Sequence, residues 1–254
     1  MRLSRVLGPV VVFLCVLAIW TAATSYGWID GLVLPSPLAV ADLFRTDPGL
    51  LASSAGVTAA EAIAGLCIGN ALGLLLAILF VNSPVSRRSV LPLAMGAQSI
   101  PIVAATPALI IAFGNGMESK ILVAVFLVFF PMLVNAMRGL RSADAEVGEL
   151  MHSLSASGFQ RLWMVRLPAA LPFIFTALKL SACSCFVAAI VAEWVASDRG
   201  LGHLIVLASS QYRADEVWAA VLICATCSMA MVGLVVLIER RAMPWLRPSG
   251  GGLS

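Results

Sequence analysis

Long apolar runs separated by short polar segments dominate the pattern of hydrophobic and polar positions along this chain. Each run is close in length to the roughly 20 residues that an α-helix needs to cross a bilayer. Transmembrane β-strands would instead alternate polar and apolar positions over about 10 residues, and the runs do not alternate. The pattern therefore predicts an all-α integral membrane protein with six transmembrane helices: Leu7–Tyr26, Val57–Val81, Val90–Phe113, Ile121–Met137, Ala169–Ala196 and Val217–Ile238.

The composition supports this class. Of the 254 residues, 61% are hydrophobic and 11% are charged, whereas a soluble domain usually carries about 25% charged residues. The six cysteines lie within the apolar runs and have no histidine partners at zinc-site spacing. We expect them to pack as small apolar side chains, and no metal site is predicted.

Arginine and lysine are divided unequally between the two sets of predicted loops. The N-terminus, the 82–88 loop, the 138–168 loop and the C-terminus are rich in arginine, while the opposite loops hold few basic residues. Because basic residues concentrate in cytoplasmic loops, we expect both termini and the 138–168 loop to face the cytoplasm. The net charge of +3 reflects this asymmetry. It does not indicate nucleic-acid binding, since no basic patch is interleaved with exposed aromatic residues.

The chain reads as one membrane domain over residues 1–242, followed by a small, polar cytoplasmic tail over 243–254 that we expect to be disordered. The outer segment 27–56 contains a Pro-Ser-Pro sequence that interrupts any long helix, so short helices are expected there. No internal repeat is visible, so the sequence gives no support to an inverted-repeat transporter.

A row of small residues follows one face of the second predicted helix, at Gly65, Gly69 and Gly73. The spacing of four residues puts them on the same side of a helix, and small residues let two helix backbones approach closely in lipid. We therefore expect this row to pack against a neighbouring helix.

Three prolines interrupt the third predicted helix, and three polar side chains accompany them: Gln98, Ser99 and Thr106. A broken, polar helix is tolerated at membrane depth only where protein or water surrounds it. We expect these side chains to line a translocation pathway. A kinked but buried packing helix, with its hydroxyl groups bonded to its own backbone, is the alternative.

Two carboxylates, Glu61 and Glu193, fall in the outer third of the membrane. A carboxylate within a span is costly unless it faces a cavity or a partner, so we assign both residues to the candidate pathway. The alternative is that each lies at the membrane interface and is simply solvated.

A polar stretch, Gly148–Pro172, separates two of the longest apolar runs. Ser157 and Gln160 have the spacing of a capping box, which predicts a helix start at this point. The residues before it predict a short helix with Leu150, Met151 and Leu154 on one side. A second helix, Phe159–Arg166, would be closed by Leu167-Pro168. An amphipathic helix lying flat on the lipid is the alternative.

This stretch resembles the cytoplasmic EAA loop of permease subunits of binding-protein-dependent ABC importers. Glu149-Leu150-Met151, Ser155 and Val165-Arg166-Leu167-Pro168 follow its pattern, although Leu150 and Met151 replace two alanines and Ser155 replaces a glycine. Five other family-like segments stand in the expected order: Leu34–Pro37, Ser99–Gly114, Phe129–Ser142, Leu167–Ser181 and Glu193–Ile205. Together they look like the nitrate, sulfonate and taurine family, in the branch associated with thiamine-precursor pyrimidines and riboflavin.

The resemblance implies a type I ABC importer permease fold in the bacterial plasma membrane, and it implies partners. A coupling helix in the loop would dock on a separate cytoplasmic ATPase dimer, which would hold ATP and magnesium. This chain itself has no G-x-x-x-x-G-K-[ST] loop. The other partners would be a second permease copy and an extracellular binding protein that delivers the solute. The residues implied in coupling are Glu149, Leu150, Met151, Leu154, Ser155, Ala156 and Ser157.

Two other function classes compete with this interpretation. A proton-driven secondary transporter could use Glu61 or Glu193 as its proton carrier, and dependence of uptake on an ATPase would distinguish it. An intramembrane enzyme is disfavoured, because His152 and His203 lie in loops on opposite sides of the membrane. No G-x-S-x-G or H-E-x-x-H motif occurs either.

Overall fold

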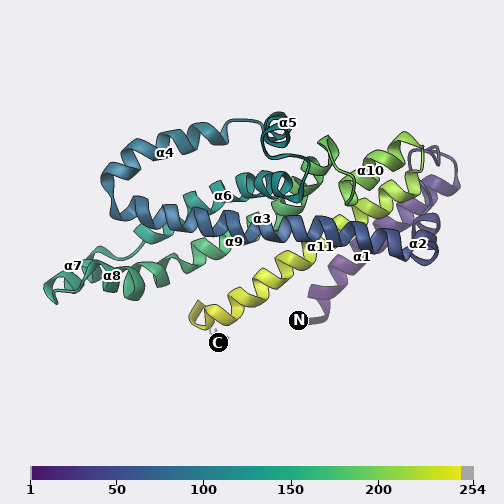
Figure 1. Ribbon diagram of the computed structural model, residues 1–254. Helices are drawn as coiled ribbons and strands as arrows, with labels where there is room; N and C mark the ends of the chain where they lie inside the picture. The colour runs from purple at the N-terminus through teal and green to yellow at the C-terminus, as the bar shows by residue number, and fades with distance from the viewer. Residues whose placement is uncertain (1, 247–254) are drawn as a thin grey trace.

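The computed structural model describes residues 2–246, apart from the side chains of residues 2–6, 9, 145 and 246, and all the regular elements in that range are helices (Figure 1). The α-helices are α1 (Arg2–Ser25), α2 (Pro37–Thr46), α3 (Pro48–Asn82), α4 (Pro84–Gln98), α5 (Ile102–Phe113), α6 (Met117–Arg141), α7 (Ala145–Ser153), α8 (Gly158–Arg161), α9 (Leu167–Val195), α10 (Leu201–Ser210) and α11 (Ala214–Ala242). A π-helical turn, η1 (Leu162–Arg166), joins α8 to α9, and a 3₁₀ turn, η2 (Pro244–Leu246), follows α11.

Four helices are long and apolar enough to cross a membrane: α3, α6, α11 and the continuous helix Gly158–Val195. The third predicted span is instead a pair, α4 and α5, which meet at an angle of 103°. Pro101 explains the break, because it lacks an N–H group and also disfavours helical geometry at Ile100. The first predicted span, α1, contains a shorter apolar helix over Val10–Ser25. By length and composition, the described residues hold four spans, or five if the bent pair is counted as one.

The outer segment contains the expected short helix, and α3 begins earlier than the sequence predicts. Ser36 caps α2, since its side chain accepts a hydrogen bond from the Ala39 N–H at 3.2 Å. The Asp47 carboxylate accepts one from the Leu50 N–H at 3.2 Å, directly before Pro48. Each proline is the first residue of a helix, where its missing N–H costs nothing. The prolines of this segment therefore start helices as well as interrupting them.

Helices α3, α6 and α9 lie side by side and form the centre of the bundle (Figure 1). Leu66 of α3, Val128 of α6 and Phe186 of α9 are buried in one cluster. A Cβ atom added at Gly73 would lie 2.7 Å from the Phe129 carbonyl oxygen of α6. Added Cβ atoms at Gly65 and Gly69 would also meet α6. The glycine row thus lies where the backbones of α3 and α6 come closest.

Glu193 joins three helices at the end of the bundle away from α7. Its carboxylate accepts hydrogen bonds from the Thr58 hydroxyl of α3 at 2.7 Å and from the Gly202 N–H of α10 at 2.5 Å. Thr58 Oγ1 in turn accepts a hydrogen bond from the Leu201 N–H at 2.8 Å. The first N–H groups of a helix have no partners within that helix. Glu193 and Thr58 supply them for α10 and hold its start against α3 and α9.

The first residues of the predicted tail, Met243 to Leu246, lie within the described range. Met243 is buried beside Phe175 and Val235, and Pro244–Leu246 form the turn η2. The rest of the predicted tail, residues 247–254, lies outside the described residues.

The Gly73→Ala variant should loosen the contact between α3 and α6. A methyl group at this position has no room, so we expect a loss of about 1–3 kcal/mol of stability, as for other overpacked sites. The measurement is the thermal midpoint of the purified protein in one detergent. Gly233→Ala on α11 is the matched control, because nothing lies within 4 Å of a Cβ added there. Equal midpoints for the two variants would contradict the close-approach interpretation.

The Thr58→Val variant should weaken the junction between α3, α9 and α10. Valine keeps the shape but leaves the Leu201 N–H without a partner, at a cost of about 1–3 kcal/mol. Thr106→Val is the matched control, since Thr106 is equally buried but bonds only to the Ile102 carbonyl of its own helix. We expect a lower thermal midpoint for Thr58→Val than for Thr106→Val. A lower midpoint for Thr106→Val than for Thr58→Val would show that the hydrogen bonds of Thr58 do not stabilise the junction.

Candidate functional site

The polar stretch of the sequence forms a helical hairpin that projects from one end of the bundle (Figure 1). We call residues 144–166, comprising α7, α8 and η1, the α7–α8 hairpin. Its first helix begins at Asp144, whose side chain accepts a hydrogen bond from the Glu146 N–H at 3.1 Å. An acidic residue at this position also complements the positive end of the helix dipole.

The turn of the hairpin is a Schellman motif. Ser155 has a positive φ of 56°, its N–H donates to the His152 carbonyl at 2.9 Å, and the Ala156 N–H donates to the Met151 carbonyl at 2.9 Å. Such a motif needs one residue in the left-handed region, which is usually glycine. This requirement gives a physical reason for the glycine in the loop pattern that the sequence resembles, and Ser155 occupies its place.

The second half of the hairpin starts as the sequence predicts and ends differently. The capping box is confirmed: Ser157 Oγ accepts from the Gln160 N–H at 3.2 Å, and Gln160 Oε1 accepts from the Ser157 N–H at 2.8 Å. The predicted end at Leu167-Pro168 is wrong. The chain passes through η1 into α9, with the Leu167 N–H donating to the Leu162 carbonyl. A widened π turn accommodates Pro168, which has no N–H to donate.

The hairpin is braced against the bundle at its return to the membrane helices. Arg166 Nη1 donates to Asn82 Oδ1, at the end of α3, at 3.0 Å. Asn82 Nδ2 donates to the Ile78 carbonyl at 2.9 Å, which fixes the orientation of the amide. A displacement of the hairpin would therefore act on α3 through this contact and on α9 through the continuous helix.

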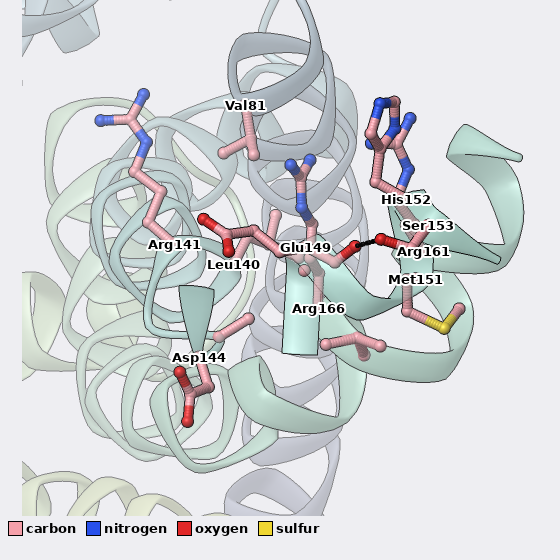
Figure 2. Close-up of a pocket in the computed structure, with 13 residues that line it drawn as sticks. Val81, Leu140, Arg141, Asp144, Glu149, Met151, His152, Ser153, Arg161 and Arg166 are labelled. Carbon is pink, nitrogen blue, oxygen red and sulfur yellow. Dashed lines mark hydrogen bonds between the residues drawn. The ribbon is translucent and has the colours of Figure 1, made fainter. Parts of the chain in front are cut away.

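Six large apolar side chains are exposed on the hairpin. Val147, Trp163 and Met164 are further along the chain from its turn. Nearest the turn, Leu150 is 59% exposed, Leu154 69% and Phe159 70%. We call these three residues the apolar tip. Met151 does not share their side as expected but lines a cavity behind the hairpin together with Glu149 (Figure 2). Of the other residues implied in coupling, Ala156 is half-buried and Ser157 is exposed.

The cavity behind the hairpin has a volume of 740 Å³ and is lined by residues of α3, α6, α7, α8 and η1 and of the loop before α7. Figure 2 shows charged side chains of both signs around it. Arg141, Arg161 and Arg166 contribute positive charge, and Asp144 and Glu149 contribute negative charge. The hairpin thus stands away from the bundle over a polar space.

Glu61 and Glu193 lie together in the interior, beside Lys120 of α6. Glu61 is 2% exposed, Glu193 1% and Lys120 3%, so a solvated position at the interface is wrong for both carboxylates. Lys120 Nζ also donates to the Asn115 and Gly116 carbonyls at 2.8 and 3.2 Å. One oxygen of Glu61, Oε2, is buried without a hydrogen-bond partner among the described residues.

The polar residues of the broken span lie apart from one another. Gln98 and Ser99 are exposed at the bend between α4 and α5. Thr106 is fully buried in α5, and its hydroxyl donates to the Ile102 carbonyl at 2.8 Å. Thr106 therefore has the backbone-bonded arrangement that the sequence left open as an alternative.

Sequence reasoning missed two residues of the carboxylate cluster, Thr58 and Lys120. Thr58 stands three residues before Glu61, which places both on one face of α3, so the spacing carried a usable signal. Lys120 reads as a loop residue at the end of an apolar run. Only the fold of the Asn115–Gly116 turn brings its ammonium group inside.

Comparison with known proteins gives one consistent family. A model of the family described as the inner membrane component of binding-protein-dependent transport systems matches residues 69–244. A probable ABC transporter permease protein of Haemophilus influenzae is 34% identical over 227 residues, which cover 89% of this chain and 93% of that protein. A formylaminopyrimidine transport permease protein of Halalkalibacterium halodurans is 29% identical over 248 residues, covering 96% and 98%.

The fold comparison agrees. The crystal structure of an amino acid ABC transporter with histidines superposes with a TM-score of 0.62 at 18% identity, covering 79% of this chain and 97% of that chain. Other relatives bear the names of permeases for riboflavin, aliphatic sulfonates, taurine and nitrate. The chain therefore belongs to the inner-membrane components of binding-protein-dependent transport systems, and it is a multi-pass permease of the ABC importer type.

Proposed function

We propose that the α7–α8 hairpin is the coupling element of this permease and docks on a separate cytoplasmic ATPase. The observation that carries the proposal is the apolar tip. Leu150, Leu154 and Phe159 are exposed on a segment that projects beyond the membrane helices. Apolar side chains gathered on a projecting polar segment mark a protein interaction site. A short helix presenting such side chains is the form that binds in a groove of a partner.

The connections of the hairpin suit it to carry motion. Helix α8 continues into α9 without a break, and Arg166 ties the same end to Asn82 of α3. Helices α3 and α9 both pack against α6 in the centre of the bundle. We infer that movement of the docked hairpin changes the tilt of this three-helix unit, which would alternate access to the solute.

We further propose six spans with both termini in the cytoplasm. In this arrangement α4 and α5 together make one broken span and α1 makes another. The apolar length of Val10–Ser25 and the arginines at the hairpin end support the proposal. One permease of this size would supply half of a pathway, so a second copy related by a two-fold axis is expected to complete it. Gln98 and Ser99, exposed at the bend, are available to line that pathway.

For the solute, we propose a small heterocycle of the hydroxymethylpyrimidine or riboflavin type, delivered by an extracellular binding protein. The names of two relatives that align over 96% and 94% of this chain support this class. An alkanesulfonate, taurine or nitrate is the alternative. It is supported by an aliphatic sulfonate permease of Bacillus subtilis that is 30% identical over 91% of this chain.

Uptake by the assembled importer should depend on ATP hydrolysis by the partner ATPase. We expect radiolabelled formylaminopyrimidine uptake to stop when the catalytic site of the ATPase is inactivated, and to continue when a protonophore collapses the proton gradient. Unlabelled riboflavin and an alkanesulfonate serve as competitors that define the solute class. Uptake that survives loss of the ATPase but fails with the protonophore would support a proton-driven transporter instead.

The Leu154→Asp variant should prevent docking of the ATPase. A charge in a buried interface centre costs about 2 kcal/mol or more, which weakens binding about thirtyfold. The measurement is the amount of ATPase that copurifies with the permease. Ser153→Asp is the matched control, since it adds the same charge one residue away, at a position that lines the cavity. Equal loss of ATPase in both variants would rule out a specific role for the apolar tip.

A further inference from the structure

A second groove lies between α4 and α6, at the same end of the molecule as the hairpin. Its volume is 270 Å³. Three arginines line it: Arg87 from α4, and Arg138 and Arg141 from the last turn of α6. The rest of its wall is apolar, formed by Leu91, Met95, Val134 and Met137.

The positive charge of this groove is not balanced within its wall. No acidic residue lines it, and the ion pairs found among residues 2–246 involve none of the three arginines. Arg87 lies close enough to Arg141 for the two guanidinium groups to repel each other. Arg141 also borders the hairpin cavity with Asp144 and Glu149, whereas Arg87 and Arg138 do not. An anionic ligand is the natural complement to such a group of arginines.

The polar and apolar parts of the groove are arranged in order along the helices. Leu91 and Met95 follow Arg87 by four and eight residues on α4, or about 6 and 12 Å along the axis. On α6, Val134 and Met137 come before Arg138 in the chain, so they lie further from the end of the helix. The groove is therefore charged at the helix ends and apolar toward the middle of the membrane helices. A soluble anion would use only the charged end.

We propose that this groove binds an anionic phospholipid, with its phosphate on Arg87, Arg138 and Arg141 and its acyl chains over the apolar wall. The site would face the cytoplasmic leaflet, which rests on the orientation given under the proposed function. A second copy of this chain is a poorer occupant. A two-fold axis at the groove would place the three arginines of one copy against the same three arginines of the other copy, and their like charges would repel.

The lipid would fill the wedge between the broken span and the bundle. Helix α4 leans away from α6 in Figure 1, and the groove lies between them. A ligand that contacts both helices stabilises their relative position. Anionic lipid would then set the position of the half of the broken span that leads to the bend at Gln98 and Ser99.

The test measures lipid retention by the full-length chain. The purified protein, reconstituted in nanodiscs of phosphatidylcholine with phosphatidylglycerol, is released into detergent and its bound lipids are counted by native mass spectrometry. We expect retained phosphatidylglycerol in preference to phosphatidylcholine. Each arginine near a lipid surface contributes about 1 kcal/mol, so Arg87→Ala and Arg138→Ala should each weaken retention about fivefold. Using two variants on different helices protects the test if one fails to fold.

Arg88→Ala is the matched control, because Arg88 is the neighbour of Arg87 on α4 and is exposed but does not line the groove. Equal weakening by Arg88→Ala would overturn the proposal in favour of diffuse surface attraction. Equal retention of both lipids would also overturn it. Displacement of phosphatidylglycerol by millimolar inorganic phosphate or an alkanesulfonate would assign the groove to a free anion. Because no ATPase or solute is present, this result is independent of the coupling and uptake experiments.

Discussion

Backbone hydrogen bonding inside a membrane sets the main constraint on this molecule, since lipid offers no partner to an unpaired N–H or C=O group. Among the described residues, three of the places where the chain departs from a regular α-helix show three different local solutions. The break before Pro101 lies at an exposed bend between α4 and α5. The π turn η1 keeps the ladder continuous in front of Pro168. At the start of α10, Glu193 and Thr58 receive the N–H groups that the helix cannot pair. The buried Glu193 carboxylate thus has a structural role, because it accepts a backbone hydrogen bond at the start of α10.

The close approach of α3 to α6 makes the centre of the bundle stiff. Gly73 lets the two backbones meet, and Gly139 of α6 meets Ala170 of α9 in the same way. The α7–α8 hairpin joins this unit directly, through Arg166 and through the uninterrupted α9. The bent pair α4 and α5 packs less extensively, over a groove lined by arginines. A stiff unit beside a looser one suits the change of helix tilt proposed for this permease, because the two parts could then move relative to each other without either one unfolding.

Local sequence patterns predicted helices and helix caps, which depend on neighbouring residues. They did not predict contacts between residues that are far apart in the chain. The capping box of Ser157 and Gln160 and most of the long helices followed from the sequence. The early start of α3 was not predicted because the expected span covered only the apolar run from Val57, although Asp47 before Pro48 is a good capping residue. Thr58, one partner of Glu193, lies 135 residues away along the chain, so their hydrogen bond could not be predicted from local spacing, even though Thr58 shares a face of α3 with Glu61. The resemblance supplied the family, and the turn at Ser155 supplied the physical reason for part of its pattern.

The π turn between α8 and α9 determines the direction in which the hairpin side chains face relative to α9. A π turn holds one residue more than an α turn. The residues before η1 are therefore rotated around the axis of α9 relative to where a regular α-helix of the same length would place them. If Leu162–Arg166 were wound as a regular α-helix with the same number of residues, Phe159 would be rotated by about 100° around the helix axis. The membrane helices would keep their contacts, but Phe159 would face a different direction. The extra residue in the π turn therefore fixes the direction in which the proposed docking surface faces.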